Sequence, residues 1–172
     1  MALTYEPISS VVTPGGSQVT FSSIPATYTD LRLVAWYPTG YNPNGDHYIF
    51  FNNDSNTSNY YSAYPYAIAD PTSVVAQQGY ANRWLYFSNA GGMYPFAAMM
   101  FVDIPSYTLS GKQKTAFYGS SQSRGDTTGG SIQWNYGLAS NVTSAINRID
   151  YYAAGGSLNS GMTLTLFGIK AA

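Results

Sequence analysis

The sequence predicts an all-β protein: an antiparallel, jelly-roll-like β-sandwich of about ten short strands. Apolar and polar residues alternate with a period of two along most of the 172-residue chain, which is typical of strands with one buried face. β-Branched and aromatic residues, which favour strands, fill these runs. The 17 Gly and 9 Pro fall mostly between them, where turns need them. Since no helical segments alternate with the strands, we expect antiparallel sheets, and ten strands usually split into two packed sheets.

The strands follow in order from the alternation and from the turn signals between them. The expected strands are Leu3–Ile8, Gln18–Ile24, Leu31–Tyr37, His47–Asn52, Trp84–Asn89, Ala97–Ile104, Thr115–Ser121, Ile132–Leu138, Ala145–Tyr152 and Met162–Ile169. Glycine and proline clusters separate many of them, as at Pro14-Gly15-Gly16, Asn44-Gly45, Gly91-Gly92, Gly129-Gly130 and Gly155-Gly156. The residues expected to face the core are Val19, Phe21, Leu31, Leu33, Leu164 and Leu166. Arg32, Val34 and Trp36 are expected on the opposite face of their strand.

The length predicts one domain, residues 1–172, large enough to bury a substantial core. Within it, residues 38–82 form a Tyr- and Asn-rich insertion region. The part from Asn53 to Asn82 is too long for a plain loop. We expect a short strand or a helical turn there, or a functional insertion.

Charge and composition restrict the classes of partner. Charged residues make up 9% of the chain, against about 25% in ordinary soluble domains. Together with 17 Tyr, this deficit predicts that neighbouring proteins cover part of the surface. The net charge of −1 comes with scattered Lys and Arg, so the sequence predicts no nucleic-acid binding. No apolar run approaches the about 20 residues of a membrane helix, and no signal peptide is visible, so no membrane partner is expected.

No catalytic, cofactor or metal site is expected from the residue types. The chain has no Cys, which excludes disulfides and thiolate chemistry and suits assembly in a reducing cytoplasm. The single histidine, His47, stands at a strand start beside no nucleophile motif, and the carboxylates are dispersed. No glycine-rich segment opens a helix to bind a nucleotide. We therefore expect a protein that is not an enzyme.

Two short motifs have simpler explanations. Asn52-Asn53-Asp54-Ser55-Asn56 has oxygen ligands at alternate positions, like the start of a calcium loop, but lacks the central Gly and the closing Glu. A turn explains it better. Arg124-Gly125-Asp126 is the tripeptide that integrins recognise, yet Gly and Asp are also ordinary turn residues.

Two aromatic segments are the candidate partner-binding surface. Rigid tyrosines flanked by amides can contact another subunit, can stack on a sugar, or can pack their own loops. A protein interface is favoured over glycan contact. The residues are Tyr37, Tyr41, Asn42, Asn44, Tyr60, Tyr61, Tyr64 and Tyr66.

Four pieces of the chain together form a recognisable pattern. They are residues 1–8 (MALTYEPI), 21–34 (FSSIPATYTDLRLV), 144–149 (SAINRI) and 161–169 (GMTLTLFGI). In this order they resemble a group of small virion structural proteins of tailed bacteriophages. The pieces bracket nearly the whole chain, whereas the middle, about residues 38–82, does not match well. The resemblance therefore concerns the scaffold more than any partner-facing surface.

The resemblance implies a structural accessory protein on the outer surface of a phage virion, assembled in the bacterial host cytoplasm. We expect it to decorate or cement the capsid by binding the major capsid protein and to form a homotrimer, as jelly-roll virion proteins often do. The alternative is a receptor-binding module of a tail fibre or baseplate that recognises a host surface glycan. Because the sequence shows no shaft segment ahead of the first strand, the capsid role is favoured.

Overall fold

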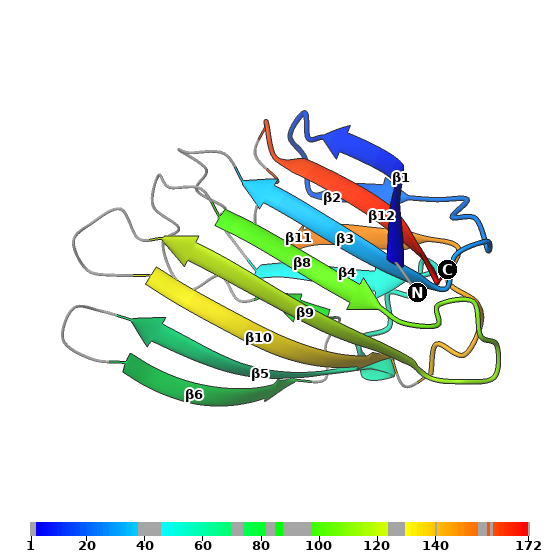
Figure 1. Ribbon diagram of the computed structural model, residues 1–172. Coiled ribbons are helices and arrows are strands. Elements are labelled where there is room, and N and C mark those ends of the chain that lie inside the picture. Colours follow the sequence, from blue (N-terminus) through cyan, green and yellow to red (C-terminus); the bar gives the residue numbers. More distant parts are fainter. Residues whose placement is uncertain are drawn as a thin grey trace.

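The protein is a β-sandwich of two antiparallel sheets (Figure 1). The computed structural model describes residues 3–37, 46–69, 74–81, 85–87, 98–123, 130–139, 141–154, 158 and 160–171. In spatial order the larger sheet contains β1 (Leu3–Val12), β12 (Thr163–Ala171), β3 (Asp30–Tyr37), β8 (Ala98–Ile104), β9 (Lys114–Ser123), β10 (Gly130–Ala139), β5 (Tyr60–Ala69) and β6 (Val74–Ala81). The smaller sheet contains β2 (Gln18–Phe21), β11 (Ile149–Ala154), β4 (Asp46–Phe51) and β7 (Leu85–Phe87). The predicted fold class is confirmed.

The chain crosses between the two sheets at most of its connections, as in a jelly roll. Strand β1 pairs with β12, so the first and last strands lie side by side, with the chain ends close together in Figure 1. The smaller sheet packs behind the larger one in that view. The only helical turn among the described residues is η1 (Thr57–Asn59), and no helix in this part of the chain is long and apolar enough to cross a membrane.

The core lies between the sheets and is built by the alternation that the sequence predicts. In β3 the odd-numbered residues are buried and the even-numbered ones are partly or largely exposed. All six residues expected inside are buried: Val19, Phe21, Leu31, Leu33, Leu164 and Leu166. Leu33 lies directly opposite Leu166 in the β3–β12 ladder, and neither has any exposed surface. Burying such a side chain stabilises the fold by about 1.5–3 kcal/mol.

The largest departure from the expected strands is the segment 60–81, which forms β5 and β6. Pro65 stands in the middle of β5, and proline is rare inside central strands because it has no N–H to donate. In the structure β5 pairs with β10 at Ala63 and again at Tyr66, and the residues between them have no partner in that ladder. The Tyr/Asn-rich region 38–82 therefore supplies β4, β5 and β6 to the two sheets.

A second departure concerns the strand expected at Ala145–Tyr152. Strand β11 begins only at Ile149, and the residues before it form a loop. Ile146 is buried, and its amide donates to the carbonyl oxygen of Tyr107 at 2.9 Å. This loop is anchored in the core by a side chain and a backbone bond outside any ladder, which a period-two pattern cannot distinguish from a strand.

Candidate functional site

The structure corrects the candidate partner-binding surface at two residues. Tyr37 and Tyr60 are 4% and 0% exposed, so neither ring faces a partner. Tyr37 continues the inward-facing alternation of β3. A Tyr-rich composition does not distinguish exposed from buried rings, and these two tyrosines belong to the core by their position in the strand.

The structure describes the six remaining candidate residues to different extents. Tyr61 is 48% exposed, because it alternates with the buried Tyr60 along β5. Tyr41, Asn42 and Asn44 lie outside the described residues, as does the Arg124-Gly125-Asp126 motif. Tyr64 and Tyr66 lie in β5, where the structure describes their backbone only. Tyr61 is the candidate that the structure places on the surface.

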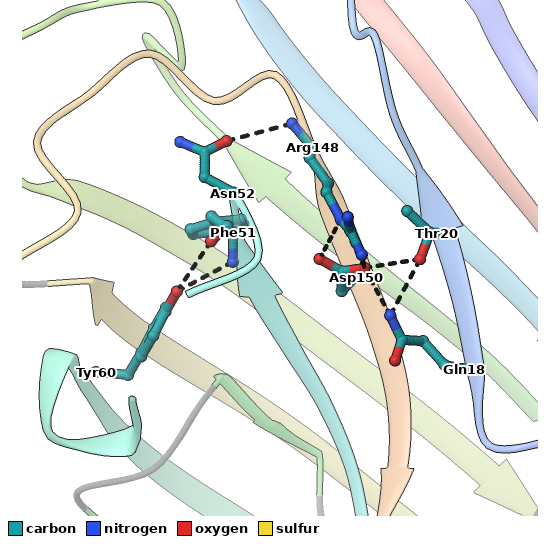
Figure 2. A network of polar contacts seen from close by, with 7 residues as sticks. All are labelled: Gln18, Thr20, Phe51, Asn52, Tyr60, Arg148 and Asp150. Carbon is teal, nitrogen blue, oxygen red and sulfur yellow. Dashed lines mark hydrogen bonds and ion pairs between the residues drawn. The ribbon is translucent and has the colours of Figure 1, made fainter. Parts of the chain in front are cut away.

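Tyr60 closes the connection between β4 and β5. Its hydroxyl accepts a hydrogen bond from the Phe51 amide at 3.0 Å (Figure 2). The same hydroxyl donates to the carbonyl oxygen of Asp54 at 3.2 Å. Its ring packs against that of Phe51 with centroids 6.3 Å apart. Burial raises the pKa of Tyr60 because the phenolate would lose its hydration. Tyr60 therefore has a structural role, since it holds the connection between β4 and β5 in place.

His47 lies in a buried polar cluster between the two sheets. Its Nδ1 is 3.1 Å from the hydroxyl of Tyr37 and 2.5 Å from that of Tyr151, and the two hydroxyls also bond to each other. The sulfur of Met100 accepts from both phenols at 4.0 and 3.9 Å. His47 is 3% exposed. The cluster joins β3, β4, β8 and β11 inside the sandwich.

A second network surrounds Asp150, whose side chain is fully buried (Figure 2). Arg148 donates two hydrogen bonds to this carboxylate, from Nε and Nη2, at 2.8 Å each. The side chains of Gln18 and Thr20, on the neighbouring strand β2, both donate to it at 2.7 Å. The hydrogen bond to Asp150 raises the pKa of Arg148. A buried carboxylate is costly unless it is bonded in this way, so the network fastens β2 to β11.

Asn52 holds the loop that carries the SAINRI piece. Its backbone is in the left-handed region at a φ of 54°, a conformation that asparagine tolerates well. Its side-chain amide donates to the carbonyl oxygen of Ala145 at 2.9 Å, and its oxygen accepts from the amide of Asn147 at 3.0 Å. The neighbouring Asp54 accepts from the amide of Asn56 at 3.1 Å. The calcium-like segment is therefore a turn that bonds to itself and to this loop.

The N-terminal and C-terminal pieces of the pattern meet around Tyr28. Its ring lies directly on Gly168, where an added Cβ would be 2.3 Å from the ring carbon Cγ. Lys170 lies 5.2 Å from the same ring and forms an ion pair with Glu6 at 3.0 Å. The bond to Lys170 lowers the pKa of Glu6. Thr29 bonds the carbonyl oxygen of Ile169 through both its amide and its hydroxyl, at 2.8 and 2.7 Å.

The larger sheet also has an apolar surface on its outer side, which the sequence analysis did not single out. We call this surface, which points away from the smaller sheet, the outer face. Its apolar members on β1, β3, β8 and β9 include Tyr5, Val12, Val34, Trp36, Met99, Phe101 and Phe117. Four of them are among the most exposed large apolar residues described: Tyr5, Val12, Trp36 and Met99. The alternation of β3 could have indicated it, since it puts Val34 and Trp36 opposite the core.

Among the described residues, no group of three or more His, Asp or Glu side chains could hold a metal ion. No protein-family model matches the chain, and no curated protein matches it. Among solved structures, an alginate lyase in complex with an alginate trisaccharide is similar at 11% sequence identity, covering 94% of this chain and 73% of that chain. Its TM-score of 0.24 is too low to support an inference.

Proposed function

We propose that the chain is a structural accessory protein of a bacteriophage virion, which acts by binding and not by catalysis. In this proposal it decorates or cements the outer surface of the capsid by contacting the major capsid protein. One observation carries the proposal: the four pieces that resemble phage virion proteins are joined to one another in the fold. A match of composition alone gives no reason for such contacts.

The contacts between the pieces are specific. Glu6 of the first piece pairs with Lys170, next to the last piece. Tyr28 of the second piece covers Gly168 of the last. The amide of Ile24 donates to the carbonyl oxygen of Asn147, which joins the second piece to the third at 3.0 Å. These contacts fix the sandwich at its chain ends and at the start of β11, so the pattern specifies a scaffold.

The low charge of the chain supports a role among other proteins. With charged residues at 9%, the surface is suited to contacts that exclude water at their centre. The poorly matching region 38–82 holds the exposed Tyr61 and, in its sequence, Tyr41, Asn42 and Asn44. A partner-specific surface is expected where the chain departs from the common pattern.

The test is binding to virus particles. Purified protein is mixed with capsids of a phage that encodes it, after the surface proteins have been stripped, and bound protein is measured by co-sedimentation. Saturable binding is expected, and Tyr61→Ala or the pair Tyr41→Ala and Tyr64→Ala should weaken it by about fivefold or more, the effect of losing an interface anchor. Leu109→Ala is a control, because Leu109 is exposed in the connection between β8 and β9.

The same samples are tested for adsorption to host cells. Binding to cells without binding to capsids would replace the capsid role by glycan recognition on a tail fibre or baseplate. Binding to neither would refute both roles.

A further inference from the structure

The outer face is unusually apolar for a sheet whose other face already packs on the core. An antiparallel sheet with one face on a core normally carries polar residues on the face in water. Here Trp36 is 49% exposed and lies directly opposite Met99, which is 43% exposed, in the β3–β8 ladder. Contiguous exposed apolar residues of this kind mark an interaction surface.

The two charged residues at the centre of this face neutralise each other. Arg32 binds Asp103 through two parallel bonds of 2.5 and 2.6 Å. The guanidinium also lies 5.4 Å from the ring of Tyr5 and 5.5 Å from that of Phe101. The ring centroids of Phe101 and Phe117 are 6.0 Å apart. A row of aromatic rings thus crosses the sheet from β1 to β9, with one internally paired charge of each sign at its centre.

We propose that the outer face pairs with the outer face of a second copy of the chain, around a two-fold axis near the Arg32–Asp103 pair. The charges decide the occupant. A two-fold axis that runs along the strands, at right angles to the ion pair between β3 and β8, reverses the direction of the pair, so each guanidinium meets a carboxylate of the other copy. The face is then complementary to itself and needs no charge from a different protein.

A single self-complementary patch closes with two copies, whereas a trimer joins two different patches. The outer face is one patch. It therefore favours a dimer over the trimer that the virion resemblance implies. Two sheets stacked in this way pack about 10 Å apart with their strands close to aligned.

The area of the face fits a stable dimer. The five strands from β1 to β9 that carry these residues, spaced at about 4.8 Å, span roughly 24 Å, and seven residues of β8 extend about 23 Å. Their product, about 550 Å² on each copy, gives about 1,100 Å² for the two copies together, above the about 1,000 Å² in total that a specific interface needs. The proposal does not depend on where in a virion the protein sits.

The first test is the mass of the full chain in solution, by light scattering and sedimentation equilibrium at micromolar concentration. We expect twice 18.6 kDa. Trp36→Lys should raise the dissociation constant of the dimer by roughly thirtyfold or more, as truncating an interface anchor does. Leu109→Lys is the matched control, because Leu109 is 53% exposed but lies off the sheet. It should leave the mass unchanged. Urea melts check that both variants are folded.

The second test uses the central charges. Arg32→Asp alone and Asp103→Arg alone each put like charges across the axis, so each variant by itself should be monomeric. An equimolar mixture of the two restores opposite charges across the axis and should recover the dimer mass. Since the mixture contains only variant chains, its recovery also shows that both are folded.

Several results would overturn the proposal. They are a monomeric wild type up to about 100 µM, a trimer, a dimer that survives Trp36→Lys, or a mixture that stays monomeric. If the wild type is monomeric and Trp36→Lys abolishes binding to stripped capsids, the face belongs to the capsid protein. The self-pairing is then wrong while the proposed virion role stands.

Discussion

Replacing Gly168 with alanine tests the contact that joins the two ends of the chain. The added Cβ would lie 2.3 Å from Cγ of Tyr28 and 2.4 Å from both of its neighbouring ring carbons. Carbon atoms prefer about 3.5–4.0 Å, so the ring has to move by more than about 1 Å. It cannot retreat freely, because the adjacent Thr29 is held by two bonds to Ile169.

Overpacking of this size costs about 1–3 kcal/mol. With a urea dependence of about 2 kcal/mol per molar, the unfolding midpoint should fall by roughly 0.5–1.5 M. Urea unfolding followed by circular dichroism measures this shift.

The reasoning is checked by the double variant. Once Tyr28→Ala has removed the ring, Gly168→Ala should cost under about 0.5 kcal/mol, because alanine is then favoured over glycine in a strand by its lower unfolded-state entropy. The difference between the two backgrounds is the coupling free energy of the contact. An equal cost with and without the ring would show that Tyr28 is not the obstacle and would refute the argument.

Three further predictions concern stability and use urea unfolding. Leu33→Ala, in the fully buried ladder position, should cost about 2–5 kcal/mol, and a loss under about 0.5 kcal/mol would mean that the alternation was misinterpreted. Asp150→Asn should cost about 1–3 kcal/mol because it removes the negative charge and replaces one of the two acceptor oxygens of a buried network by a donor, whereas the more exposed Asp103→Asn should cost under about 1 kcal/mol; equal costs would contradict this. Burial lowers the pKa of Lys114 in the folded protein below its ordinary 10.5. At a pH between the folded and the unfolded pKa, the unfolded chain binds the proton more tightly than the folded protein, so the free energy of unfolding rises with pH. Lys114→Met removes this rise, and a wild-type-minus-variant difference that stays constant as the pH approaches 10.5 would count against it.

The alternation of side chains determined which face of each strand is buried, because it is a local property of an extended backbone. Leu33 and Leu166 could be assigned to the core before their strands were known to be neighbours. The same period puts Trp36 on the opposite face. It also separates Tyr37 and Tyr60 from Tyr61, although the Tyr-rich composition of their segments suggested one common role for all three.

Only the tertiary structure decided which residues far apart in the sequence meet. Tyr28 covers a glycine 140 positions away, and Asp150 is bonded by Gln18, 132 positions away. The sequence could not give these contacts, because the pairing of distant strands depends on the free energy of the whole sandwich. The outer face has the same origin: Tyr5, Arg32 and Phe101 form a continuous surface only because β1, β12, β3 and β8 are aligned in one sheet. Period two tells which side of a strand a residue occupies, but strand order and register decide which residues lie beside it.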